Sequence, residues 1–318
     1  MMLTAFLTTL AQMARILLFL VVGFGLNRLH ILPKGAGAGI SRLDTMLLLP
    51  AMLIHSNMTE FRLADVGAYG RLVLLGGLLW VIVAAISLPI AKKMGKDNSL
   101  ERGVYLYGLC FPNTSAIGTP LALAILGTAG LFQYNLFVLP FVIMTYAWGM
   151  GLFLDIERKN THKRFLTNLL NPIFVAMVIG LTLGALNGSQ WMPALLTDFL
   201  GDLGSCYVPV SLLLVGYTIA DYSLLEVFHR VKGYIFSLLR LLVFPLLVLV
   251  LVKLLGQSSF IATLAVLAFA GPSGMNVVVF PASYGQDCQT GVNIVLISCL
   301  GSVLTVPLLY AVVQWMFP

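Results

Sequence analysis

The chain has 318 residues, of which 59% are hydrophobic and only 9% are charged. A soluble domain carries about 25% charged residues, so this chain cannot cover a globular surface with polar groups. Its mean hydropathy of +0.99 indicates that lipid is its natural surrounding. The net charge of +6 could suggest nucleic acid. The basic residues lie mostly in alternate loops, which explains that charge without a nucleic-acid partner.

Apolar stretches long enough to cross a bilayer recur along the whole chain, and no segment between them resembles a separate soluble domain. The first stretch lacks a preceding basic segment and a following A-x-A site, so we expect a permanent helix and not a cleavable signal. We predict an all-α integral membrane fold of ten transmembrane helices. In chain order they cover residues 5–27, 38–58, 68–91, 102–126, 131–154, 170–187, 196–219, 233–255, 259–284 and 290–315.

Lysine and arginine are distributed unevenly among the loops. The odd-numbered loops and their edges hold thirteen of the eighteen basic residues, and the even-numbered loops hold three. The densest cluster lies in the central loop, from Asp155 to Asn168. Because basic loops stay in the cytoplasm, we expect both termini outside the cytoplasm, in a multi-pass protein of the plasma (inner) membrane.

The two halves of the chain carry matching landmarks at offsets of 159 to 161 residues. The matching pairs are Pro50 with Pro209, Gly95 with Gly256, and Pro112 with Pro272. Each half, 1–157 and 158–318, contains five predicted helices. An odd number turns the second copy upside down in the membrane, so we predict inverted repeats, a recurrent plan of secondary transporters.

The fourth and ninth predicted helices are interrupted near their middles. The fourth contains Pro112-Asn-Thr-Ser115, and the ninth contains Pro272-Ser-Gly274. Proline removes a backbone donor, and Asn113, Thr114, Ser115 and Ser273 are good N-cap residues for a restarted helix. A plain proline kink is the simpler reading of one such site. Two in matching positions favour half-helix N-termini, which suit an anion such as a carboxylate.

Four motifs in order resemble the auxin efflux carrier family. They are Pro-Asn-Thr-Ser-x-Ile-Gly-x-Pro-Leu from Pro112, Gly-Pro-Ser-Gly-Met-Asn ending at Asn276, Leu49-Pro50-Ala-Met-Leu, and Val208-Pro-Val-Ser-Leu-Leu-Leu-Val-Gly216. The resemblance implies the ten-helix fold of bile-acid sodium symporters, with crossed broken helices 4 and 9. It also implies a scaffold of helices 1, 2, 6 and 7, a moving unit of helices 3–5 and 8–10, and elevator-type exchange.

The resemblance further implies a substrate class and a site. Plant members export auxin and bacterial members include malonate carriers, and the short central loop here favours a prokaryotic-type member. The family's crossover positions correspond to Pro112, Asn113, Pro272 and Asn276. A homodimer through the scaffold is expected by the same resemblance. The complete set of predicted substrate-binding residues is Pro112, Asn113, Thr114, Ser115, Pro272, Ser273, Gly274 and Asn276.

Four ionisable residues within predicted helices are candidate charge partners, because charges inside a membrane are costly. Arg15 and Arg240 could attract an anionic substrate or extend toward the interface. Asp44 and Asp202 could pair with an arginine, carry a coupling proton or lie at the interface. No cofactor or metal is expected. The sequence leaves open whether protons or sodium ions drive transport.

Other functions are less consistent with the sequence. An intramembrane enzyme would need a nucleophile–base pair or a metal set, and neither HExxH nor GxSxG is present, so we do not expect an enzyme. The predicted function is a secondary active transporter of a small organic anion. A sodium-coupled bile-acid-type symporter is the main alternative, and a channel or a membrane sensor is a further one.

Overall fold

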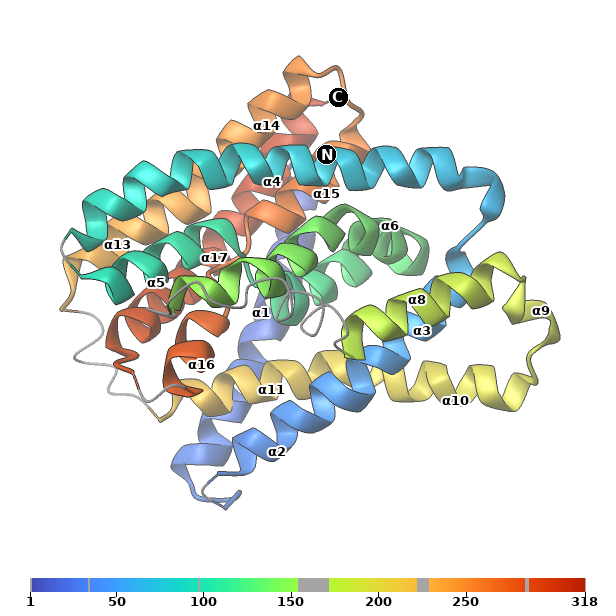
Figure 1. The fold of residues 1–318 in the computed structure, drawn as a ribbon, viewed down its shortest axis with the longest axis horizontal. Coiled ribbons are helices and arrows are strands. Elements are labelled where there is room, and N and C mark those ends of the chain that lie inside the picture. Colours follow the sequence, from blue (N-terminus) through green and yellow to red (C-terminus); the bar gives the residue numbers. More distant parts are fainter. Residues whose placement is uncertain are drawn as a thin grey trace, which may run out of the picture.

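The computed structural model describes residues 2–33, 35–96, 98–153, 172–221, 229–283 and 286–317. Within these ranges the chain is built from helices and contains one isolated β-bridge but no strand (Figure 1). The helices are α1 (Met2–Arg28), α2 (Ala36–Leu43), α3 (Leu49–Glu60), α4 (Val66–Gly95), α5 (Ser99–Cys110), α6 (Thr119–Ala147), α8 (Pro172–Ala185), α9 (Gly188–Trp191), α10 (Ala194–Ser205), α11 (Tyr207–Ile219), α13 (Val231–Leu238), α14 (Phe244–Leu254), α15 (Ser259–Phe269), α16 (Asn276–Ser283) and α17 (Gln289–Met316). Short turns join some of them: η1 (Asp44–Leu48), η2 (Leu63–Asp65), η3 (Thr114–Gly118), η4 (Gly149–Phe153) and η5 (Leu239–Val243). The predicted all-α class is confirmed.

Several helical segments are suited to a bilayer. Seven of them in the described part of the chain are long and apolar enough to cross a membrane. They are Thr9–Arg28, Ala36–Glu60, Leu63–Gly95, Thr114–Thr145, Ala194–Ile219, Val231–Leu254 and Gln289–Met316. Two shorter apolar helices, α8 and α15, fall below that length. The multi-pass membrane character is thus confirmed, while the count of ten helices and the inverted repeat stay predictions. The central loop from Asp155 to Asn168 lies outside the described residues.

Three of the longer segments contain one π-helical turn each, and each turn ends two residues before a proline. The turns η1, η3 and η5 precede Pro50, Pro120 and Pro245. Proline has no N–H, so the carbonyl four residues earlier loses its helical partner. A π turn shifts the hydrogen-bond register there and lets the helix continue. The same turns carry two of the candidate charged residues, Asp44 and Arg240.

Close backbone contacts hold the helices together. In the packing of α1 against α11, a Cβ atom added at Gly23 would lie 2.1 Å from the Leu213 carbonyl oxygen, and one at Gly216 would lie 2.0 Å from the Leu20 oxygen. Membrane helices commonly associate through such small residues, because lipid supplies no hydrophobic force between them. The glycines of α1 and α11 therefore fix the distance between these two helices.

The buried apolar side chains form two clusters. The larger one joins α4–α6 with α13–α17 and also takes in parts of α1 and α11. The smaller one lies between η1, α3, α8 and α11, and consists of Leu48, Leu49, Met52, Leu53, Ala176 and Tyr207. In Figure 1, α3, α8, α9 and α10 lie together on one side of the molecule, and α13, α14 and α17 lie on the other. The site lies between these two sides, with α2, η1 and α11 on one wall and α5, η3, α6 and α16 on the other.

Candidate functional site

The two sequence interruptions lie against each other in the structure. Helix α5 ends at Cys110 and α15 ends at Phe269. The Asn113 amide donates to the Pro272 carbonyl at 2.8 Å, and the Gly274 amide donates to the Phe111 carbonyl at 3.1 Å. These bonds flank the antiparallel bridge between Pro112 and Ser273. Backbone groups freed by the breaks thus hydrogen-bond to one another. Irregular backbone inside a bilayer needs such internal partners, because the hydrocarbon offers none.

The first interrupted helix restarts at a capped N-terminus. The side-chain oxygen of Asn113 accepts a hydrogen bond from the Ala116 amide at 3.0 Å. The Tyr134 hydroxyl donates to the Thr114 carbonyl at 3.1 Å and secures the following turn. The N-cap role that the sequence indicates for Asn113 is therefore confirmed. The same role for Ser273 is wrong, because α16 begins three residues later, at Asn276.

A cavity of about 590 Å³ lies in front of the paired breaks. This volume is in the range of small-molecule sites. Six of the eight predicted substrate-binding residues line it: Pro112, Asn113, Thr114, Ser115, Gly274 and Asn276. Pro272 and Ser273 do not line it, and the Ser273 side chain is 1% exposed with no hydrogen-bond partner for its hydroxyl among the described residues. The cavity is thus walled on one side by the breaks.

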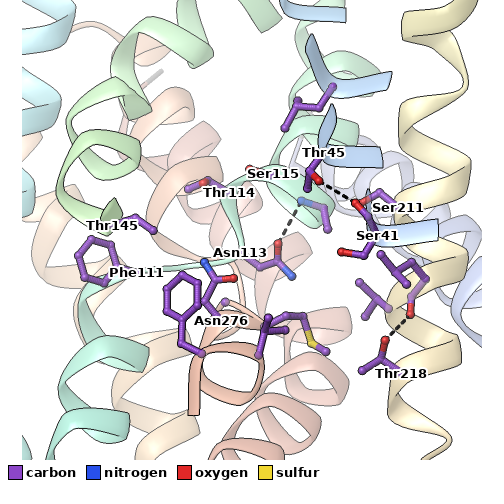
Figure 2. A pocket seen from close by; sticks show the side chains of 18 of the residues that line it. Ser41, Thr45, Phe111, Asn113, Thr114, Ser115, Thr145, Ser211, Thr218 and Asn276 are labelled. Carbon is purple, nitrogen blue, oxygen red and sulfur yellow. Dashed lines mark hydrogen bonds between the residues drawn. The ribbon is translucent and has the colours of Figure 1, made fainter. Parts of the chain in front are cut away.

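Figure 2 shows Asn113 and Asn276 on this wall, one from each break. The amide nitrogen of Asn276 donates to the Tyr107 hydroxyl at 2.9 Å. The amide of Asn113 uses its oxygen for the cap, so its nitrogen is the group left for a ligand. Two amides and a helix N-terminus therefore converge on the same part of the cavity.

The opposite wall comes from α2, η1 and α11. It adds the hydroxyl-bearing residues Ser41, Thr45, Ser211 and Thr218 (Figure 2). Thr45 and Thr218 donate to carbonyls one turn earlier in their own helices. No helix break marks these residues in the sequence, and a hydroxyl such as that of Ser211 in an apolar helix is simply read as a helix-packing group. The available signal was their spacing, four residues in one helix and seven in the other, which places each pair on one helix face.

Aromatic rings and one charge complete the lining. The rings belong to Tyr107, Phe111, Phe141, Tyr207, Tyr217 and Phe280. Asp221 is the charged side chain that lines the cavity among the described residues, and its carboxylate accepts a hydrogen bond from Asn27 at 2.8 Å. The described wall therefore presents no basic side chain to a ligand.

None of the four candidate charge partners lines the cavity. Arg15 and Asp202 are exposed on α1 and α10. Asp44 is buried in η1, beside the cavity-lining Thr45, and its Oδ1 atom has no hydrogen-bond partner among the described residues. Arg240 is fully buried in η5, with its Nη1 atom 3.4 Å from the Leu109 carbonyl oxygen.

The fold and the cavity define a multi-pass helical membrane protein with a polar site at the meeting point of broken helices. The family model described as "Membrane transport protein" matches residues 8–310. The chain therefore belongs to this membrane transport family, and the resemblance to auxin efflux carriers drawn from its motifs is confirmed. A search among curated proteins gave no match.

Proposed function

We propose that the chain is a secondary carrier that binds a small organic anion, such as an auxin-like or malonate-like carboxylate, in the cavity beside the paired breaks. The observation that carries this proposal is the joint position of Asn113, Asn276 and the capped helix N-terminus on one cavity wall. Amide donors and helix N-termini can hydrogen-bond a carboxylate with no positive side chain in contact with it. Family membership supports a transporter and not an enzyme.

The proposed transport mechanism is an elevator. The predicted scaffold, helices 1, 2, 6 and 7, corresponds to α1, α2–α3, α8 and α10–α11, of which α2, η1 and α11 supply the hydroxyl wall. The predicted moving unit supplies the breaks. The cavity also reaches Gly35, Gly37 and Asp221, which flank the first and seventh loops. The basic residues predict that these loops are cytoplasmic, so the cavity corresponds to a state open to the inside.

Uptake into proteoliposomes tests the proposed function. We expect labelled indole-3-acetate or malonate to enter in a saturable manner, with faster uptake when the unlabelled compound fills the lumen. Conductance without such exchange would support a channel, and binding without flux would support a sensor. Sodium-dependent uptake of taurocholate, with no uptake of either carboxylate, would favour the bile-acid-type alternative. Imposed proton and sodium gradients identify the coupling ion in the same assay.

The predicted orientation is tested by cysteine labelling in whole cells. In a background without the four native cysteines, Asn160→Cys in the central loop and Gln257→Cys between α14 and α15 each supply one thiol. We expect an impermeant maleimide added outside to label residue 257 and to reach residue 160 only after permeabilisation, because the basic central loop should stay inside. Labelling of residue 160 in intact cells would reverse the orientation.

A further inference from the structure

Arg240 is the largest fully buried side chain of the described residues, with 0% of its surface exposed. Its Nε and Nη2 atoms have no hydrogen-bond partner there, and its Nη1 bond to the Leu109 carbonyl is long, at 3.4 Å. No carboxylate forms a salt bridge with it among the described residues, where the recorded ion pair joins Lys232 and Glu101. A guanidinium keeps its proton at neutral pH, so a whole positive charge is held in the protein interior.

The positive charge of Arg240 lies at the C-terminal end of α5. The last turn of a helix leaves carbonyl groups without helical partners and carries the negative end of the helix dipole. At the end of α5, the Trp80 indole N–H donates to the Cys110 carbonyl at 3.2 Å, and Arg240 donates to the neighbouring Leu109 carbonyl. Arg240 therefore lies at the negative end of α5, directly before the break at Phe111.

A helix break creates both signs of partial charge at the same place. The restarted helix at Asn113 offers a positive N-terminus, and α5 ends a few residues away with a negative C-terminus. The two ends oppose each other in the field that a ligand experiences. The described cavity wall adds only the carboxylate of Asp221. Without a further cation, the paired breaks would have little net preference for an anion.

We propose that Arg240 is the specificity-determining charge of the site. From a position outside the cavity lining, it neutralises the negative C-terminal end of α5, so that the N-terminus capped by Asn113 attracts a carboxylate. Arg240 does not touch the ligand and acts through α5, which makes it a positioning residue. This inference rests on the proposed function. It explains why a costly charge is buried here, since a purely structural cap needs a donor but no charge.

The test compares a carboxylate with its neutral amide. The probes are indole-3-acetate with indole-3-acetamide, and malonate with malonamide, measured by calorimetry on the purified protein. Wild type is expected to bind at least one carboxylate about tenfold more tightly than its amide, the order of magnitude of one charge acting through protein. Arg240→Met should remove this preference and leave the amide affinity unchanged, and Arg240→Lys should keep most of it.

Two further variants separate charge from structure. Arg240→Gln keeps a donor for the Leu109 carbonyl without the charge, and it should lose the preference just as Arg240→Met does. Arg15→Met removes an exposed intramembrane arginine and should bind both probes as wild type does. An equal loss of carboxylate and amide binding in the Arg240 variants, or equal wild-type affinities for both probes, would overturn the inference. Wild type that transports neither carboxylate would instead refute the proposed function.

Discussion

Replacement of Asn113 by alanine is expected to lower carboxylate transport by about two orders of magnitude, since a hydrogen bond to a charged group contributes about 1.5–3 kcal/mol. Two effects act together at this residue. The amide nitrogen is the donor that the cap leaves free for a ligand, and the amide oxygen fixes the first turn of the restarted helix. Initial rates of uptake into proteoliposomes, corrected for the amount of folded protein, measure the loss.

The control for this variant is Asn98→Ala. The Asn98 side chain accepts a hydrogen bond from the Glu101 amide at 3.1 Å and caps α5 in the same way, but it does not line the cavity. Losing either cap should cost about 1 kcal/mol of stability. We expect similar thermal stabilities for the two variants and a transport defect in Asn113→Ala alone. Normal transport by Asn113→Ala would contradict the assignment of Asn113 to the substrate site. Equal transport defects in the two variants would mean that Asn113 acts only as an N-cap.

The interrupted helices could be predicted from the sequence because their cause is local. Proline and small polar residues within apolar stretches stop a helix wherever they occur. The N-cap at Asn113 follows the same local rule and agrees with the structure. The rule fails at Ser273, where the bridge to Pro112 and the bond from the Gly274 amide to the Phe111 carbonyl keep the chain out of a helix until Asn276. Tertiary hydrogen bonds there outweigh a local preference.

The hydroxyl wall of the cavity could not be predicted, because a few hydroxyls on one face of an otherwise apolar helix do not show whether that face meets a cavity or another helix. Helices that face protein on one side and lipid on the other are apolar toward both, so hydrophobicity alone does not give their orientation. Arg240 and Arg15 illustrate the consequence. Both are arginines within apolar stretches, yet one is fully buried and the other is exposed. The difference between the two arginines comes from the packing of segments that are distant in the sequence, such as η5 against the end of α5.

Replacement of Gly23 by leucine is expected to prevent stable folding. A Cβ atom at this position would lie 2.1 Å from the Leu213 carbonyl oxygen, which belongs to the backbone of α11 and cannot rotate away. The two helices would have to separate, and overpacking of this kind costs at least about 1–3 kcal/mol even in adaptable cores. Size-exclusion elution and the thermal unfolding temperature of the detergent-solubilised protein measure the effect.

Gly25→Leu is the matched control, because a Cβ atom at Gly25 meets nothing within 4 Å. The same side chain two residues away on α1 should preserve folding, and higher helix propensity could add up to about 1 kcal/mol. If both variants fold like wild type, α1 and α11 are not held at the observed distance. The distance matters for the site as well, because α11 carries Ser211 and Thr218 into the cavity. A milder Gly23→Ala variant that still folds should therefore transport poorly, since displacing α11 moves one wall away from the paired breaks.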